Sequence, residues 1–326
     1  MNFHHLAYWQ DKALSLAIEN RLFINGEYTA AAENETFETV DPVTQAPLAK
    51  IARGKSVDID RAVSAARGVF ERGDWSLSSP AKRKAVLNKL ADLMEANAEE
   101  LALLETLDTG KPIRHSLRDD IPGAARAIRW YAEAIDKVYG EVATTSSHEL
   151  AMIVREPVGV IAAIVPWNFP LLLTCWKLGP ALAAGNSVVL KPSEKSPLSA
   201  IRLAGLAAAI GPTIFVDVDP NASLSREEIF GPVLVVTRFT SEEQALQLAN
   251  DSQYGLGAAV WTRDLSRAHR MSRRLKAGSV FVNNYNDGDM TVPFGGYKQS
   301  GNGRDKSLHA LEKFTELKTI WISLEA

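Results

Sequence analysis

Two short apolar runs in the middle of the chain constrain its fold more than any other feature. The first covers residues 158–165 and stops at Pro166, and the second covers residues 187–190. Continuous apolar runs of this length are typical of strands that are buried on both faces of a parallel sheet. Helical periodicity follows each run, over residues 171–184 and 197–209. Strand, helix, strand and helix in this order predict a parallel, doubly wound α/β sheet.

The segments on either side of this core predict a larger α/β protein. Upstream, Asn25-Gly26 between two β-prone runs predicts a hairpin. Ser79-Pro80 predicts the start of a helix, whose apolar stripe extends to about Gly110. The remaining expected elements are helices at 63–70, 123–139, 242–250 and 265–276, a short acidic helix after 216, and strands at 36–40, 213–216, 233–236, 258–261, 279–282 and 317–322.

The composition excludes several classes of protein. The chain has 326 residues, a formal net charge of −3 and one cysteine. This length suits about two domains, and the balanced charge leaves no basic field for nucleic acid. A single cysteine excludes an intrachain disulfide framework and suits a reducing compartment. No apolar run approaches the roughly 20 residues of a membrane helix or resembles a signal peptide, so we expect a soluble, cytoplasmic protein.

Few residues are suited to covalent or metal chemistry. Cys175 shares a predicted helix face with three leucines, so we expect a buried core side chain rather than a nucleophile. His148-Glu149 begins like a zinc-protease helix, but Met152 stands where the second histidine is required, and we expect no metal site. The glycine-rich stretch at 296–301 lacks the lysine of a phosphate-binding loop and is interpreted as a turn.

The ends of the two apolar runs carry the strongest candidate site. Ligands of open α/β sheets bind beyond the carboxyl ends of the strands. Pro166-Trp-Asn-Phe-Pro170 follows the first run, and Lys191-Pro-Ser-Glu194 follows the second. Asn168 offers an amide donor for an oxyanion, and Lys191 and Glu194 offer partners for sugar hydroxyls. The alternative is that the aromatic residues belong to the core and the charged residues to a solvated loop.

These segments resemble the NAD(P)-dependent aldehyde dehydrogenase superfamily. The motifs lie in the order of the family and cover nearly the whole chain. Within the family the chain is most similar to the bacterial enzymes that oxidise γ-glutamyl-γ-aminobutyraldehyde in putrescine breakdown. The matching motifs are Glu105-Thr-Leu-Asp-Thr-Gly-Lys-Pro112, Pro166-Trp-Asn-Phe-Pro170, Trp176-Lys-Leu-Gly-Pro-Ala-Leu182, Lys191-Pro-Ser-Glu194, Glu227-Glu-Ile-Phe-Gly-Pro232 and Pro293-Phe-Gly-Gly-Tyr-Lys-Gln-Ser-Gly301.

The resemblance implies roles for individual residues. Asn168 would be the side-chain half of the oxyanion hole, Lys177 would lie near the general-base region, and Phe294 would stand at the entrance for a small aldehyde substrate. The cofactor would be NAD, because Glu194 repels a 2′-phosphate, with NADP also possible. The implied cofactor-binding residues are Ile164, Val165, Pro166, Trp167, Lys191, Ser193, Glu194, Glu228 and Phe230.

A large part of the family pattern is absent between Leu206 and Thr213. The Gly-Ser-Thr loop, the glutamate general base and the nucleophilic cysteine of the family would all lie in this interval, and none is present. The family chemistry requires a thiolate that attacks the aldehyde and an activated water that hydrolyses the thioester. We therefore expect a chain that descends from an aldehyde dehydrogenase but is inactive.

Two other interpretations stay open. The chain would be a pseudoenzyme that binds a nucleotide or assembles with full-length subunits, or an active dehydrogenase that uses Cys175. The resemblance implies an aldehyde dehydrogenase-like fold with a truncated Rossmann-type sheet, which would assemble as a homo-oligomer if folded. The expected parts are a cofactor-binding domain at 1–139 and 157–208, a catalytic-domain remnant at 209–310, and a β bridging arm at 140–156 and 311–326. The lost strands should leave an exposed sheet edge.

Overall fold

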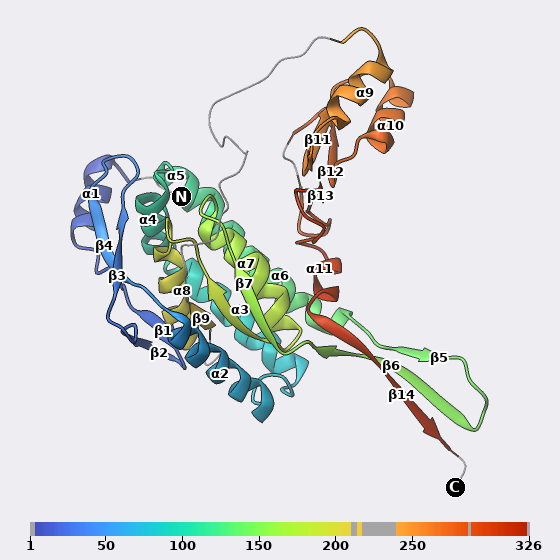
Figure 1. The fold of residues 1–326 in the computed structure, drawn as a ribbon, viewed down its shortest axis with the longest axis horizontal. Coiled ribbons are helices and arrows are strands. Elements are labelled where there is room, and N and C mark those ends of the chain that lie inside the picture. Colours follow the sequence, from blue (N-terminus) through green and yellow to red (C-terminus); the bar gives the residue numbers. More distant parts are fainter. Residues whose placement is uncertain (1–3, 210–213, 217–238, 286–287, 325–326) are drawn as a thin grey trace. The chain divides into compact units, whose positions relative to one another are not determined.

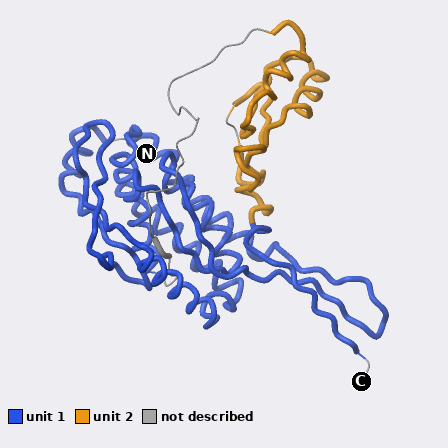
Figure 2. Tube along the Cα trace, viewed as in Figure 1, with its two compact units in different colours: residues 1–220, 311–326 blue, residues 221–310 orange. Residues whose placement is uncertain are grey.

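The chain divides into two compact units. The computed structural model describes residues 4–209, 214–216, 239–285 and 288–324. Unit 1 comprises residues 1–220 and 311–326, and unit 2 comprises residues 221–310 (Figure 2). The acidic helix after residue 216 and the strand at 233–236 that the sequence predicts lie outside the described residues.

A five-stranded sheet forms the centre of unit 1 (Figure 1). Its order is β2-β1-β9-β8-β7, and β7, β8 and β9 run parallel to one another. The strands are β1 (Leu22–Ile24), β2 (Glu27–Thr29), β7 (Val160–Ile164), β8 (Ser187–Lys191) and β9 (Ile214–Val216). Helix α7 (Pro170–Ala183) joins β7 to β8, and α8 (Leu198–Ala208) joins β8 to β9. The predicted parallel α/β unit is confirmed.

The hairpin at Asn25-Gly26 joins β1 to β2, as predicted. Both turn residues have positive φ, 55° and 87°, which is the conformation of a two-residue turn with a left-handed backbone. β1 runs antiparallel to β9 through the pair Phe23 and Val216. An N-terminal hairpin therefore completes the sheet on the far side of β9.

Strand β7 differs from the prediction of burial on both faces. It pairs with β8 on one side and lies at the edge of the sheet among the described residues. Ile164, at its carboxyl end, is 66 % exposed, although Ala163 is buried. The sequence pattern indicates only that the strand is apolar. Side chains of a strand alternate between the two faces of a sheet, and Ala162 and Ile164, which share one face, are both exposed.

Helices pack around this sheet, and the stripe that begins at Ser79 is divided between two of them. Ser79 caps α3 by accepting a hydrogen bond from the Lys82 N–H. The chain leaves helical geometry at Asn97, whose side chain donates to the Leu93 carbonyl. A second helix then ends at Gly110 with φ 73°. The helices before residue 140 are α1 (Leu6–Leu14), α2 (Ser56–Arg72), α3 (Pro80–Ala96), α4 (Ala98–Thr109), α5 (Ile113–His115), a π-helix (Ser116–Asp120), α6 (Ile121–Ala134) and a 3-10 helix (Ile135–Lys137).

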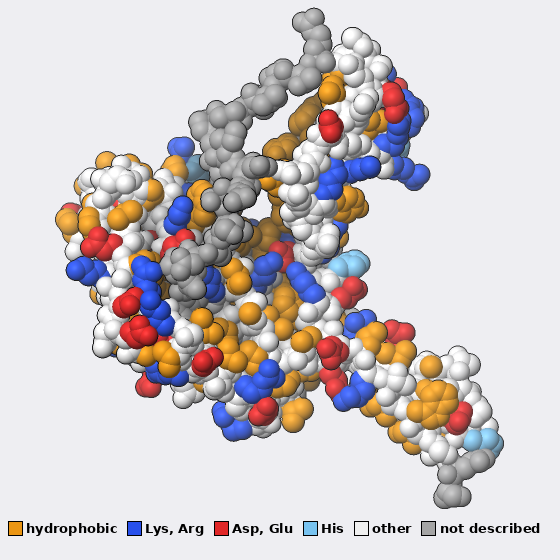
Figure 3. All heavy atoms as spheres, viewed as in Figure 1, with side chains coloured by type: hydrophobic (Ala, Val, Ile, Leu, Met, Phe, Trp, Pro, Cys, Tyr) orange, Lys and Arg blue, Asp and Glu red, His pale blue; other side chains and the backbone are white. Residues whose placement is uncertain are grey.

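Two further sheets belong to unit 1. The strands β3 (Thr36–Val40) and β4 (Pro47–Ala52) form an antiparallel hairpin. The arm is a three-stranded sheet of β5 (Glu141–Ala143), β6 (Glu149–Pro157) and β14 (Thr315–Ser323), and it carries the predicted C-terminal strand. Figure 3 shows apolar side chains gathered along this arm, and Trp321 on β14 is 58 % exposed.

Unit 2 is a small α/β region. Its parallel pair β11 and β12 packs with α10, and Leu246, Met271 and Leu275 are the buried side chains of its core. These elements confirm the predicted alternation after residue 240. The described elements after β9 and before β14 are α9 (Glu242–Asn250), β10 (Tyr254–Gly255), β11 (Gly257–Val260), α10 (Leu265–Arg274), β12 (Ser279–Val282), β13 (Tyr297–Lys298) and α11 (His309–Glu312). Among the described helices, none is both long and apolar enough for a membrane span.

Candidate functional site

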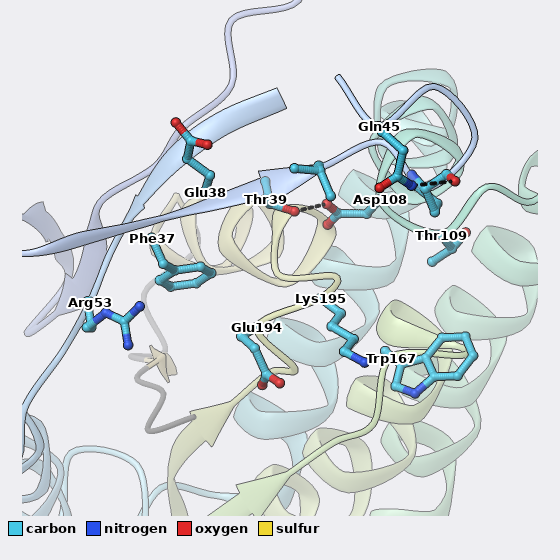
Figure 4. A pocket seen from close by; sticks show the side chains of 12 residues that line it. Phe37, Glu38, Thr39, Gln45, Arg53, Asp108, Thr109, Trp167, Glu194 and Lys195 are labelled. Atoms are coloured by element: carbon cyan, nitrogen blue, oxygen red, sulfur yellow. Dashed lines mark hydrogen bonds between the residues drawn. The ribbon is translucent and has the colours of Figure 1, made fainter. Parts of the chain in front are cut away.

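A cavity of about 530 Å³ opens beyond the carboxyl ends of β7 and β8. This is the location at which ligands bind to open α/β sheets. Figure 4 shows Phe37 and Trp167 on opposite sides of the cavity, with Glu194 and Lys195 between them. The lining residues are Phe37, Glu38, Thr39, Val40, Pro42, Gln45, Arg53, Asp108, Thr109, Trp167, Glu194 and Lys195. The two loops that the sequence singles out therefore meet at one site, together with the β3–β4 hairpin and the end of α4.

Hydrogen bonds fix the two loops to each other. The Val165 N–H donates to the Lys191 carbonyl at 3.1 Å, and the Ser196 hydroxyl donates to the Trp167 carbonyl at 3.2 Å. The Lys191 Nζ lies 3.4 Å from the Glu194 Oε2, in an ion pair between two partly exposed side chains. The loops form one wall that carries both aromatic and charged groups.

Glu105 occupies the N-terminus of α7. Its Oε2 accepts hydrogen bonds from the Leu171 N–H at 3.3 Å and from the Ser199 hydroxyl at 3.0 Å. The carboxylate is fully buried, and its Oε1 has no hydrogen-bond partner among the described residues. Negative charge at a helix N-terminus is stabilised by the free N–H groups there. Glu105 therefore accepts a hydrogen bond at the N-terminus of α7, where an anionic ligand would otherwise bind.

Asp108, one turn further along α4, accepts a hydrogen bond at the N-terminus of α8. Its Oδ2 accepts from the Leu198 N–H at 2.8 Å, and its Oδ1 accepts from the Thr39 hydroxyl at 2.9 Å. The aspartate is 4 % exposed and lines the cavity. Both helices that follow the parallel strands therefore carry an internal carboxylate at their N-termini.

Burial has the largest effect on the pKa of each of these two carboxylates. It raises the pKa of Glu105 to about 7, although the Lys111 charge and the hydrogen bonds oppose this. It raises the pKa of Asp108 to about 7 as well, against the opposing hydrogen bonds from Leu198 and Thr39. Lys111 lies 3.9 Å from Glu105 and 2.7 Å from Asp120, so its charge is shared with a second carboxylate. A buried charge that is only partly compensated favours its neutral form.

Asn168 precedes α7 in the loop after β7. Its Oδ1 is buried and has no hydrogen-bond partner among the described residues. The neighbouring Phe169 ring lies 3.8 Å from the Lys111 Nζ, in a cation–π contact with the same cation that faces Glu105. The motif at 105–112 therefore holds the α7 end of the loop that carries the candidate oxyanion donor.

Cys175 is a core side chain, as predicted from its helix face. It is fully buried in α7, and burial raises the pKa of its thiol well above the ordinary range. Leu171, Leu178 and Leu182 on the same helix are also buried. A thiol that is neutral and inaccessible is a poor nucleophile.

The other predicted site residues fall into four groups. Near the cavity, Val165 and Ser193 are buried, whereas Pro166 and Trp167 are exposed. Lys177 is partly exposed on α7. Phe294 lies in unit 2, where its backbone pairs with Asp305. Glu228 and Phe230 lie outside the described residues.

Sequence reasoning did not assign roles to Glu105 and Asp108, although they stand inside a recognised motif. Acidic residues three positions apart share a helix face. This face also carries Leu101 and Leu104, and both leucines are buried. An acidic pair on an apolar face is the signal that points to buried, hydrogen-bonded carboxylates. Among the described residues, no group of three or more His, Cys, Asp or Glu side chains is placed to hold a metal ion.

Comparison with known proteins identifies the family. The pattern of the aldehyde dehydrogenase family matches residues 28–211 and residues 206–320. The chain belongs to the aldehyde dehydrogenase family. The two matches overlap at residues 206–211, so the family pattern is interrupted where the sequence predicts its missing block.

The relatives of this aldehyde dehydrogenase chain agree with the narrower resemblance. The NADP/NAD-dependent aldehyde dehydrogenase PuuC of Escherichia coli K12 is 65 % identical over 495 positions, with 100 % of each chain covered. The solved structure of γ-glutamyl-γ-aminobutyraldehyde dehydrogenase from Burkholderia cenocepacia J2315 has a TM-score of 0.94 at 38 % identity, with 99 % and 100 % coverage. An indole-3-acetaldehyde dehydrogenase in complex with NAD+ has a TM-score of 0.93 at 40 % identity, with 98 % and 99 % coverage.

The alignment with PuuC also measures the missing block of this family member. It extends over 495 positions and the chain supplies 326 residues, so at least 169 positions have no counterpart, the difference between the two numbers. Sixty-five per cent of 495 positions is about 322 identical residues. Nearly every residue that is present therefore matches PuuC, and the difference between the two proteins is concentrated in the interruption.

Proposed function

We propose that this chain is a catalytically inactive derivative of a γ-glutamyl-γ-aminobutyraldehyde dehydrogenase. The observation that carries this proposal is the state of Cys175, the only cysteine in the chain, which is fully buried in the core of α7. Oxidation of an aldehyde in this family requires an accessible thiolate next to the cofactor. The near-complete identity with PuuC outside the interruption supports the putrescine-derived aldehyde as the ancestral substrate.

The cofactor of the family is NAD(P), and the described residues fit one part of it. When bound, this cofactor would supply a hydride acceptor, the nicotinamide ring. Glu194 lines the cavity and is paired with Lys191; both suit the hydroxyl groups of a ribose, and Trp167 provides an aromatic wall. The N-termini of α7 and α8 do not suit a pyrophosphate, because Glu105 and Asp108 already accept from their N–H groups. A nucleotide would be held at its sugar end.

A second candidate function is nucleotide binding without turnover. The cavity of about 530 Å³ favours it, because this volume lies within the range of about 300–1,000 Å³ that is typical of small-molecule sites.

In this proposal the chain consists of a cofactor-binding domain at 1–139 and 157–208, a catalytic remnant at 209–310 and a bridging arm at 140–156 and 311–326. The exposed apolar side chains of the arm support assembly through that sheet, with other copies or with full-length subunits. We place the protein in the cytoplasm.

Turnover and thiol accessibility test the proposed inactivity together. The purified chain is mixed with NAD and γ-glutamyl-γ-aminobutyraldehyde, and NADH formation is followed alongside the same assay on the Cys175→Ala variant. We expect no NADH above the enzyme-free rate from either protein. A thiol reagent should label Cys175 only after denaturation. NADH formation by the unaltered chain that the variant lacks would contradict the proposal.

A further inference from the structure

We propose that this chain dimerises through the outer edge of β7, where β7 of a second copy pairs antiparallel and joins the two sheets into one. This edge is a different surface from the arm, and dimerisation through it goes beyond the proposed function. β7 is the last strand of the five-stranded sheet, and among the described strands it pairs with β8 only. A strand edge without a neighbour presents N–H and C=O groups that a further strand can pair with.

The backbone of β7 directs alternate residues toward this edge. The Val165 N–H, directly after the strand, donates to the Lys191 carbonyl of β8. Successive residues of a strand direct their backbone groups to opposite edges. Val160, Ala162 and Ile164 therefore direct their N–H and C=O groups outward, where no described strand pairs with them.

The outer edge of β7 lacks the features that usually block strand pairing. Charged side chains, prolines and bulges protect most sheet edges. Residues 160–164 are Val-Ile-Ala-Ala-Ile, and their register with β8 is unbroken. The opposite edge of the same sheet is β2, which has only three residues and carries the exposed charged side chain of Glu27. Of the two edges, β7 is therefore the one that suits a further strand.

A second copy of the chain supplies a matching strand. An incoming strand must itself have an unpaired edge, and every copy presents one. When two β7 strands run antiparallel and centre on Ala162, Val160 of each copy lies opposite Ile164 of the other. All of these residues direct their backbone groups outward, so the opposed pairs exchange about six hydrogen bonds. The pairing brings large side chains opposite large ones, Ala162 opposite itself, and no charges within 160–164 together.

The pairing also covers the exposed apolar face of β7. Ala162 and Ile164 are exposed on the face that they share with Val160. Val160 packs against the buried cluster that includes Ala62 and Ala66 of α2. The second copy therefore brings its Val160, together with the helix that covers it, beside the exposed Ile164. Five residues per strand make an interface smaller than the standard size, so we expect a dissociation constant in about the micromolar range.

Sedimentation velocity of the full chain between about 1 and 100 µM tests the proposal, and we expect association that increases with concentration. Ala162→Lys and Ala162→Glu place like charges opposite each other, so each should weaken this step about tenfold. An equimolar mixture of the two variants should regain the association, because opposite charges then meet. Ala96→Lys, at an exposed position at the end of α3, is the matched control and should associate like the unaltered chain.

Cysteine substitutions test the register. Cys175 is fully buried, so Ala162→Cys provides one accessible thiol per chain. In the proposed pairing the two copies of position 162 lie about 5.5 Å apart between Cα atoms, a separation that suits a disulfide. Ala162→Cys should therefore form a disulfide-linked dimer under mild oxidation. Ile164→Cys should not, because its opposite residue is Val160.

Four results would overturn the proposal. The first is a chain that stays monomeric at about 100 µM. The second is association that is unchanged in both Ala162 variants, and its loss in Trp321→Glu would then assign it to the arm. The third is a mixture of the Ala162 variants that does not regain association. The fourth is cross-linking of Ile164→Cys but not of Ala162→Cys. Far-UV circular dichroism of each variant confirms that it is folded.

Discussion

The two carboxylates at the helix ends should make the stability of the chain fall as the pH rises. Burial raises the pKa of Glu105 from 4.5 and of Asp108 from 3.8, in each case to about 7. At pH values between the ordinary pKa and the raised pKa, these two groups stay protonated in the folded chain but are ionised in the unfolded chain. The protonated state therefore stabilises the fold at acidic pH, and this contribution is lost as the pH rises through 7.

The size of the effect follows from the pKa shifts. One pH unit in this range changes the free energy of unfolding by at most about 1.4 kcal/mol per group. Between pH 5.5 and pH 8 each carboxylate should therefore cost about 2 kcal/mol, and the pair about 4 kcal/mol as an upper bound. Salt-bridged surface carboxylates such as Glu133 have a lowered pKa and are ionised in both states throughout this window. Surface carboxylates of this kind therefore add nothing to the slope in this window.

Urea unfolding followed by far-UV circular dichroism measures this dependence at several pH values. Glu105→Gln can keep the one oxygen that accepts hydrogen bonds, whereas Asp108→Asn keeps one of two accepting oxygens. Neither variant can ionise, so each should remove about half of the decline with pH, whatever its effect on stability at a single pH. Glu71→Gln, at an exposed position on α2, is the matched control and should leave the slope unchanged. Stability that is flat or increases from pH 5.5 to 8, or a decline that survives in the double variant, would refute the reasoning.

Three substitutions test the packing around this core. Asn186→Ala should lower the free energy of unfolding by about 3 kcal/mol in urea titrations, because its buried amide donates to the Ala181 and Phe314 carbonyls and accepts from the Gly159 N–H. Gly179→Ala should lower the melting temperature at a cost of about 1–3 kcal/mol, because an added Cβ would lie 2.6 Å from the Tyr131 ring, and an unchanged melting temperature would contradict this packing. Cys175→Ala should cost about 1 kcal/mol for the lost core sulfur and leave ligand binding unchanged, as calorimetry and urea unfolding would show.

Local sequence signals were enough to locate most elements. Asn25-Gly26 is one of the few residue pairs suited to a two-residue hairpin, and Ser79-Pro80 combines a cap with a first-turn proline. Strands β7 and β8 follow from their continuous apolar runs, and α7 and α8 follow from helical periodicity. The convergence of the two loops at one cavity follows from the rule that parallel strands end on the same side of a sheet.

Other features depend on contacts that the sequence does not display. The exposure of Ile164 depends on which elements cover its face of the sheet, and that is a property of the whole fold. The break at Asn97 interrupts an apolar stripe that continues in both helices. The roles of Glu105 and Asp108 arise only when α4 meets the starts of α7 and α8, which lie more than 60 residues further along the chain.

Strand β9 shows what a parallel sheet requires of an incoming segment. It begins directly after the interruption at 206–211, yet it aligns beside β8 in register, with Ile214 opposite Val188. A segment from beyond the missing block thus takes the place that the right-handed crossover from α8 makes available. Whether such a protein tolerates an internal deletion therefore depends on whether the join preserves the alternation of strands and helices along the chain. A join that leads from a helix into an apolar stretch keeps the order of helix and then strand, whichever residues were lost. A join that leads from one strand directly into another would break that order.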